Sequence, residues 1–302
     1  MIRYLQRRQI DDEQWNRVIA ASPYEGIYPY TWYLDACADH WGGLVMDRYE
    51  CIMPVAYRKK IGMKYTYQPL YCQQLGVFSA APVDPEISRM FLYALKKQFR
   101  MGDYALNEGN IVGEERGFEV TDNANYVLSL HADYETISGN YNENCRRNIR
   151  KAAASEIEVT DQVTIDEVVA LKKFIDPGRT DRDYGQIKAF FHRLKETGTV
   201  QVHGARVGDH LVAAAIFAFS KRRVYFLLSA SSERGKERRA MFLVVDRFIR
   251  EHAGEALKLD FEGSNISSVA RFFRGFGAKP QIYQRVSFKN TVSKLKKMLQ
   301  GA

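Results

Sequence analysis

Hydrophobic and polar positions along the chain follow the spacing of helices in some segments and the spacing of strands in others. Between residues 86 and 99 the apolar positions recur every three or four residues, which predicts an amphipathic helix. Between residues 43 and 78 alternating and β-branched residues are broken by turns, which predicts strands. The strands expected in the first half are 3–6, 44–46, 51–57, 70–78, 104–106 and 126–130, and the helices are 11–20, 31–40 and 86–99.

The second half of the chain repeats this order of elements. The helices expected there are 165–174, 184–195, 239–252 and 266–276, and the strands are 199–206, 210–219, 223–230, 257–261 and 282–288. A Met-Phe-Leu triplet lies in one helix of each half, at 90–92 and 241–243, and the strand that follows ends in Glu-Gly both times. We interpret the repeat as an internal duplication that gives two α/β domains of similar topology, with a seam near residues 130–140.

Composition places the chain among ordinary globular proteins. Its 302 residues suffice for one large domain or two of average size, with 46% hydrophobic and 26% charged residues. The net charge of +8 favours anionic partners such as nucleotides, tRNA, phosphorylated substrates or anionic lipid. A basic surface without a specific partner explains the charge equally well, and no DNA partner is expected.

Cysteine usage and hydropathy bear on the compartment. None of the four cysteines has the spacing of a metal site, so we expect free thiols in a reducing compartment and no bound metal. The first residues lack the apolar core of a signal peptide, and the longest apolar run, 211–219, is far shorter than the roughly 20 residues that span a bilayer. These features predict a cytoplasmic protein, and peripheral contact with a membrane is left open.

A basic segment lies between a predicted strand and a predicted helix, at residues 229–239. Its cations crowd the start of the helix, where they oppose the helix dipole, and a bound phosphate would reverse that cost. The alternative is a solvated loop whose charges are partly offset by Glu233 and Glu237. The residues expected to bind the phosphate-bearing donor are Leu228, Ser229, Arg234, Gly235, Lys236, Arg238 and Arg239, together with Asn265.

A second basic segment covers residues 144–151. On a helix, Arg146 lies beside Arg150 and Arg147 lies beside Lys151, and such like-charge pairs are unfavourable without an anion or an acid nearby. An acidic substrate or a tRNA backbone would supply that anion. An exposed helix face paired with acids of the other domain is an equally good interpretation.

Two carboxylates alternate at the end of the predicted strand 257–261. Strand geometry sends Asp260 and Glu262 to the face opposite Leu259, beside a loop that contains Gly263. Such carboxylates can orient an amine or accept its proton. They can also hold Arg271 or Arg274 in ion pairs, an interpretation that we favour for Asp260 and not for Glu262.

Two further features carry weaker signals. His192, His203 and His210 form neither a catalytic triad nor a metal set, so we expect them to be surface or hydrogen-bonded histidines. The tail 291–302 is predicted to be an amphipathic helix, with Val292, Leu295, Met298 and Leu299 on one stripe. It is expected to pack on its own protein, and a membrane-surface role is the minority interpretation.

The order strand, hairpin, strand, basic Gly-containing turn, helix, strand, helix, strand resembles the GNAT N-acyltransferase fold. Residues 146–152, Arg-Arg-Asn-Ile-Arg-Lys-Ala, are similar to the basic helix of FemABX-like proteins. Segments 260–264 and 269–278 also resemble parts of those proteins. Those proteins carry two GNAT-like domains in tandem. The resemblance implies an α/β (α+β) chain with a mixed, mostly antiparallel sheet in each domain. We divide it into 1–133, 134–290 and the tail 291–302.

The resemblance also implies a function. Members of the group transfer an acyl or aminoacyl group from a CoA thioester or an aminoacyl-tRNA to an amine, without a tightly bound cofactor. The acceptor implied is a small-molecule, lipid or peptide amine. The donor carbonyl would be polarised by a backbone N–H within 227–230. The catalytic residues expected are Glu262, Tyr225 acting with a water, and Asp260, and Arg146, Arg147, Arg150 and Lys151 are expected to bind substrate.

Two other functions compete with this prediction. A non-catalytic GNAT-like scaffold would bind a phosphorylated or anionic ligand without reaction, because the turn at Arg234 carries bulky charged residues. A lipid-modifying N-acyltransferase would act at a membrane surface and use the basic tail.

Overall fold

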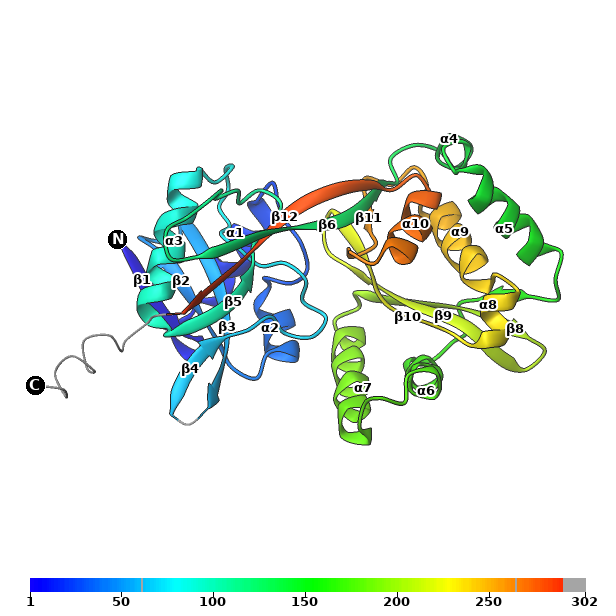
Figure 1. Ribbon diagram of the computed structural model, residues 1–302, viewed down its shortest axis with the longest axis horizontal. Helices are drawn as coiled ribbons and strands as arrows, with labels where there is room; N and C mark the ends of the chain where they lie inside the picture. Colours follow the sequence, from blue (N-terminus) through cyan, green and yellow to red (C-terminus); the bar gives the residue numbers. More distant parts are fainter. Residues whose placement is uncertain (61, 264, 290–302) are drawn as a thin grey trace, which may run out of the picture. The chain divides into compact units, whose positions relative to one another are not determined.

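The computed structural model describes residues 1–60, 62–263 and 265–289, and the chain divides into two compact units. The first unit comprises Met1–Asn123 and the chain from Ile282, and the second comprises Ala124–Gln281. Each unit is a mostly antiparallel sheet flanked by helices (Figure 1), which agrees with the predicted α/β (α+β) class of two domains. The boundaries 1–133 and 134–290 stay a prediction, and the tail 291–302 lies outside the described residues.

The first unit has the strand order β1-β2-β3-β4-β5-β12-β6, in which β6 contributes its first residues. The β4–β5 pair is parallel, at Thr66 and Gly102. The elements that belong to this unit or enter it are β1 (Ile2–Gln6), η1 (Arg7–Gln9), α1 (Asp12–Ala21), α2 (Thr31–Cys37), β2 (Trp41–Met46), β3 (Cys51–Lys60), β4 (Met63–Thr66), α3 (Pro85–Gln98), β5 (Met101–Ala105), β6 (Glu119–Ser129) and β12 (Lys279–Lys289).

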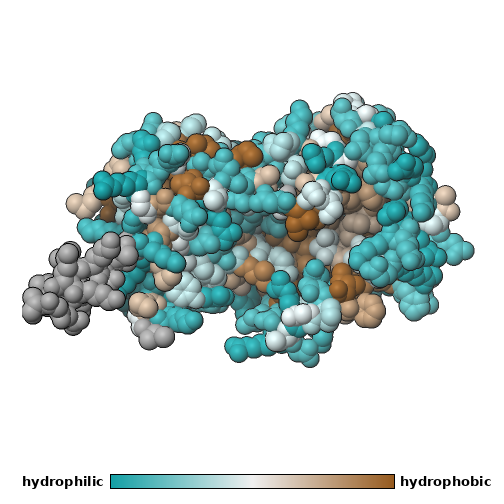
Figure 2. Space-filling view, viewed as in Figure 1, coloured by the Kyte–Doolittle hydropathy of each residue, from teal (hydrophilic) through white to brown (hydrophobic). Residues whose placement is uncertain are grey.

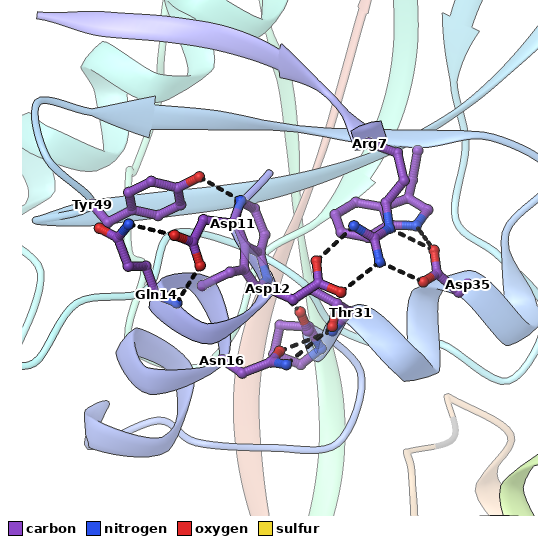
Figure 3. Close-up of polar contacts among 11 residues, drawn as sticks. Arg7, Asp11, Asp12, Gln14, Asn16, Thr31, Asp35 and Tyr49 are labelled. Atoms are coloured by element: carbon purple, nitrogen blue, oxygen red, sulfur yellow. Dashed lines mark hydrogen bonds and ion pairs between the residues drawn. The ribbon is translucent and has the colours of Figure 1, made fainter. Parts of the chain in front are cut away.

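An arginine at the start of this unit joins its first two helices. Arg7 donates to both carboxylate oxygens of Asp12 in α1, at 2.6 and 2.9 Å, and to both of Asp35 in α2, at 2.8 and 2.7 Å (Figure 3). Trp41 also donates to Asp35. Burial opposes the ionised form of Asp35, but these hydrogen bonds hold its pKa below the ordinary value. These bidentate hydrogen bonds hold α2 in a fixed position beside α1.

One predicted strand is wrong. Residues 70–78 form no strand, and their ladder is reduced to one bridge between Phe78 and Ile52. Tyr71 has φ 59° and Gly76 has φ 107°, and left-handed residues interrupt the extended backbone that a ladder requires. The apolar residues of the segment are still buried, which explains why its pattern is strand-like.

The second unit has the strand order β6-β11-β10-β9-β8-β7, with only the β10–β11 pair parallel. Most of its described helices begin at side-chain caps, such as the capping boxes of Thr164 with Glu167 and of Thr180 with Asp183. Its elements are α4 (Tyr134–Gly139), α5 (Glu143–Ala153), β7 (Glu158–Thr160), α6 (Ile165–Ile175), α7 (Asp181–Glu196), β8 (Val200–Val207), β9 (His210–Phe219), β10 (Arg223–Ser231), α8 (Glu233–Glu237), α9 (Ala240–His252), β11 (Lys258–Asp260) and α10 (Ser267–Gly275).

Helices cover both faces of this sheet. Helix α9 packs on one face of β9 and α6 packs on the other, so the run Ala213–Ala214–Ala215 in β9 is fully buried. Small residues there let both helices approach the strand. On the α9 face, the rings of Phe217 and Phe248 stack with centroids 3.7 Å apart. This core anchors α9, and the start of α9 borders the candidate site.

The surface is predominantly polar. Figure 2 shows hydrophilic residues over most of the visible face, with apolar residues in separate small areas. Phe174 and Ile266 are exposed by 79% and 63%, and isolated apolar residues of this kind are normal on a protein surface. In the described part of the chain, no helix is long and apolar enough to cross a membrane.

Candidate functional site

A cleft opens in the second unit where two neighbouring strands separate. Strands β10 and β11 pair in parallel only from Arg223 to Tyr225, and β10 then continues to Ser231 without that partner. The space beside the unpaired part of β10 is a cleft of about 570 Å³. Its lining residues come from β10, α8, the start of α9 and α10, with Ile175 from the end of α6.

A β-bulge lies in β10 at the edge of this cleft. Phe226 pairs with Phe217 of β9, and Leu228 pairs with the preceding residue, Ile216. Leu227 therefore has no opposite residue in the register. A bulge releases a residue from the ladder and turns its backbone, so it can direct an N–H toward a ligand. This irregularity falls inside 227–230, where the sequence places the carbonyl-polarising group.

The mouth of the cleft is basic. Gly235, Lys236 and Arg239 line it, and a Cβ on Gly235 would lie 2.2 Å from the carbonyl oxygen of Val212. Lys236 donates to Glu233 at 2.7 Å, whereas Arg239 has no acidic partner among the described residues. Helix α9 has no acid in its first turn and no side-chain cap. Its N–H groups and the two cations can together hold an anion.

Arg239 adopts an unusual backbone conformation. It is the N-cap of α9 with φ 62° and ψ 28°, in the left-handed region that glycine and asparagine usually occupy. This conformation lets the chain turn sharply from the short helix α8, which the sequence suggested only as a loop, into α9. A strained non-glycine residue beside a cleft points to a role for its side chain.

A buried ion pair joins the strands at the point where they separate. Arg223 of β10 donates to the Oδ2 atom of Asp260 at 2.8 Å, and Asn125 donates to the same oxygen at 2.9 Å. The two charged side chains are exposed by 8% and 1%. Arg223 therefore occupies the place in the ion pair that the sequence analysis suggested for Arg271 or Arg274.

Glu262 follows this ion pair directly. Its backbone N–H donates to Oδ1 of Asp260 at 2.8 Å, and its φ is 54°. Asp260 thus holds the backbone of the half-buried Glu262 in a left-handed conformation at the end of β11. Tyr225 lies between Val224 and Phe226, both in the core under α9, so strand alternation sends its side chain to the opposite face of the sheet.

The four basic residues of the segment 144–151 lie on α5, as the helical spacing predicts. Glu143 of the same helix interacts with Arg150 at 3.1 Å and with Arg146 at 3.7 Å, and Arg147 donates to Asn144. The acid comes from the same helix and not from the other domain. None of the four residues lines the cleft, so their substrate-binding role stays a prediction.

The structure brings together only part of the predicted site. Ser229, Gly235, Lys236 and Arg239 line the cleft, whereas Leu228, Arg234, Arg238 and Asn265 do not. The residues that sequence reasoning missed are the apolar ones from α9 and α10. The amphipathic pattern of α10 and its position directly after β11 were the signals that could have identified them. Ala230, inside the predicted stretch 227–230, also lines the cleft, and the lining residues not predicted are Ile175, Phe226, Ser231, Met241, Phe242, Ser268, Val269, Phe272 and Phe273.

The corresponding place in the first unit is closed by side-chain amides. Residues 75–78 precede α3 as β10 precedes α9, and Leu75 bonds to β5. The backbone N–H of Val77 donates to Asn110 at 2.6 Å, and its carbonyl accepts from Asn107 and Asn110. A Cβ on Gly76 would lie 2.3 Å from Asn110. We therefore place the candidate site in the second unit.

A second cavity of about 390 Å³ lies at the far end of β8, where β7 no longer pairs with it. It is lined by His203, which is 4% exposed and contacts Phe217 and Phe248 edge-on. Burial lowers the pKa of His203, and Glu251, 3.7 Å from its Nε2 atom, offsets only part of that effect. His203 is therefore mainly neutral when the protein is folded at neutral pH.

His203 is expected to make stability depend on pH. Below about pH 6.5 the unfolded chain takes up a proton that folded His203 resists, so the free energy of unfolding falls as the pH is lowered. Replacing His203 by Phe removes this contribution, whose slope is at most about 1.4 kcal/mol per pH unit. Urea unfolding between pH 5 and 8 measures it, with replacement of the exposed His210 by Asn as control. An unchanged slope in His203→Phe contradicts the prediction.

Comparison with known proteins agrees with this geometry. Residues 139–265 match the family model of the acetyltransferase (GNAT) domain. No curated protein matches significantly. Among solved structures, the chain is similar to FemX, with a TM-score of 0.65 and 11% identity over 98% of this chain and 99% of that one.

Two further structures share the architecture. A tandem GNAT protein from the clavulanic acid biosynthesis pathway has a TM-score of 0.61 and 10% identity, over 97% of this chain and 100% of that one. The C-terminal domain of a lysylphosphatidylglycerol synthetase, described as putative, from Agrobacterium fabrum has a TM-score of 0.55 and 10% identity, over 95% and 94%. The match to the GNAT domain model lies within the second unit, and the chain as a whole shares the tandem GNAT fold of these structures.

Proposed function

We propose that this chain is an N-acyltransferase whose reaction takes place along the unpaired part of β10. The observation that carries the proposal is the combination of splayed strands, a bulge at Leu227 and a basic helix start around one cleft. Transfer of an acyl group between two bound molecules needs positioning and carbonyl polarisation more than covalent catalysis. The cleft supplies surfaces for both.

The donor would enter by its phosphates. Lys236, Arg239 and the first N–H groups of α9 bind them at the mouth, and the donor arm runs along the unpaired backbone of β10. The carbonyl of the acyl group then accepts a hydrogen bond from the backbone at Leu227. That bond strengthens as negative charge develops on the oxygen, so it favours the transition state over the bound donor.

The acceptor contributes a neutral amine. Its nitrogen attacks the carbonyl carbon, a C–N bond forms, and the bond to the leaving thiolate or alkoxide breaks. The proton lost by the amine passes to Glu262, and the leaving group takes up a proton from solvent. Tyr225 faces the other side of the sheet and acts only if the acceptor approaches from there, through a water. Asp260 positions Glu262 and makes no contact with substrate.

The identity of the donor is tested by binding. CoA thioesters and aminoacylated tRNA are titrated separately against the protein by calorimetry. We expect one of the two classes to bind with a micromolar or lower dissociation constant and to acylate an amine such as a lysine peptide or an aminolipid. Absence of binding by both classes would overturn the proposal and leave a non-catalytic scaffold.

Replacing Glu262 by Gln is expected to lower kcat by about 100-fold or more, because general-base catalysis contributes about 10²–10⁴. The dissociation constant of the donor should change little, since Glu262 lies outside the donor cleft. Single-turnover acylation measures the rate, and calorimetry measures binding. Glu237→Gln, which removes an exposed acid of α8 that does not line the cleft, is the matched control. A Glu262→Gln variant with wild-type kcat would remove Glu262 from the mechanism.

A further inference from the structure

The cleft beside β10 is predominantly apolar behind its basic mouth. Phe226 comes from the strand, Met241 and Phe242 come from the start of α9, and Val269, Phe272 and Phe273 come from α10. The rings of Phe242 and Phe272 meet edge-to-face, 4.8 Å apart, and join the two helices. A volume of about 570 Å³ lies within the range of sites that bury a drug-sized ligand.

The polar groups of the cleft are unevenly distributed. Its cations are Lys236 and Arg239, and its other polar side chains are serine hydroxyls. No aspartate or glutamate is among the described residues that line it. The α-ammonium of an aminoacyl group bound there would be desolvated beside two cations and without a carboxylate, which is strongly unfavourable.

The size of the apolar wall argues against a small acyl group as well. An acetyl group brings a single methyl of its own to a wall that carries four phenylalanines. Each further methylene that enters the cleft removes apolar surface from water and increases the affinity. The basic mouth fits an anionic group of the ligand, and the apolar wall fits an aliphatic chain. The ligand that has both is an amphiphile.

We propose that the donor carries a medium- or long-chain aliphatic acyl group on a phosphate-bearing thiol, as in acyl-CoA thioesters of about eight carbons or more. The inference rests on the proposed function, because it names the donor class of that same cleft. The acyl chain packs against α10 while the phosphates stay at Lys236 and Arg239. Charge sets where the head binds, and the phenylalanine and valine side chains set the chain length.

The test is a chain-length series. Acetyl-, butanoyl-, hexanoyl-, octanoyl- and decanoyl-CoA are titrated below their micellar concentrations. We expect the dissociation constant to fall by up to about fourfold per buried methylene, and by at least about tenfold from acetyl to hexanoyl. It should keep falling to about eight carbons or more and level off when the cleft is full. Equal dissociation constants across the series would overturn the inference and leave acyl transfer intact.

A variant of the wall locates the chain. Val269→Phe fills part of the cleft with a larger side chain, so the affinity should level off at a chain shorter by two to four carbons, while acetyl-CoA binding stays the same. Leu70→Ala, which removes an apolar side chain that is 49% exposed in the first unit, is the control and should not change the series. A Val269→Phe series identical to wild type would place the chain elsewhere and overturn the inference.

The series also separates this inference from the proposed function. Binding of aminoacylated tRNA with no binding of any CoA thioester would reject the aliphatic donor and keep acyl transfer. Failure of both donor classes would reject the function itself.

Discussion

Replacing Arg223 by Met is expected to lower the free energy of unfolding by about 3–5 kcal/mol, because removing one member of a buried ion pair leaves the other charge uncompensated. Asp260 is 1% exposed, and the hydrogen bonds that it accepts from Asn125 and from the N–H of Glu262 come from neutral groups. Urea unfolding monitored by circular dichroism measures the change. An exposed pair offers the matched control: Arg17→Met, which breaks the contact with Glu13, should have little effect.

The double variant Arg223→Met with Asp260→Asn separates loss of the pair from the buried charge. It removes both charges, and the asparagine amide keeps the shape of the aspartate carboxylate. The double variant should therefore be more stable than Arg223→Met alone. If the double variant loses more free energy of unfolding than the two single variants lose together, the charges themselves hold the strands, and not the balance between them. The acylation rate should fall in Arg223→Met more than donor affinity does, because Asp260 positions Glu262 and not the donor.

The architecture was accessible from the sequence because it rests on periodic patterns. Helix 165–174 and the strands 210–219 and 223–230 are close to the observed α6, β9 and β10. The tandem arrangement followed from the repeated order of elements and from the Glu-Gly ends of two strands. The Met-Phe-Leu triplets were a weaker guide, because Phe91 lies in the middle of α3 and Phe242 in the first turn of α9.

The site was less accessible because its residues meet only after folding. The basic turn was visible as a run of cations, and Arg239 and Lys236 are at the mouth of the cleft. The partner of Asp260 could not be predicted, since the strand alternation that placed the carboxylate does not say which arginine of the chain lies beside it. The strained backbone at Glu262 and Arg239 also has no sequence signature. Glycine or asparagine usually adopts the left-handed conformation, and neither residue type is present at these two positions.

The difference between the two units shows why sequence repeats do not transfer function. Both carry a Glu-Gly pair shortly after a strand, yet Asn107 and Asn110 tie the backbone of Val77 in the first unit. In the second unit the corresponding stretch of β10 faces a cleft. Two amide side chains therefore bond the backbone in the first unit at the place where the second unit has its cleft.

Replacing Arg239 by Gly is expected to change binding and stability in opposite directions. Glycine adopts φ 62° without strain, so the free energy of unfolding should rise by up to about 1 kcal/mol, offset in part by the greater freedom of the unfolded chain. The same change removes a cation from the cleft mouth, so the dissociation constant of the phosphate-bearing donor should increase about tenfold to 100-fold.

Two further variants at this position make the prediction specific. Arg239→Lys keeps the charge and should recover part of the affinity, whereas Arg234→Gly removes a cation that does not line the cleft and should leave donor binding unchanged. The affinity lost in Arg239→Gly should also shrink as salt is raised, because the contact is electrostatic. Equal loss of affinity in Arg234→Gly and Arg239→Gly would mean that the basic segment attracts the donor only through its summed charge. The strained backbone at residue 239 would then serve the turn between α8 and α9 and not the ligand.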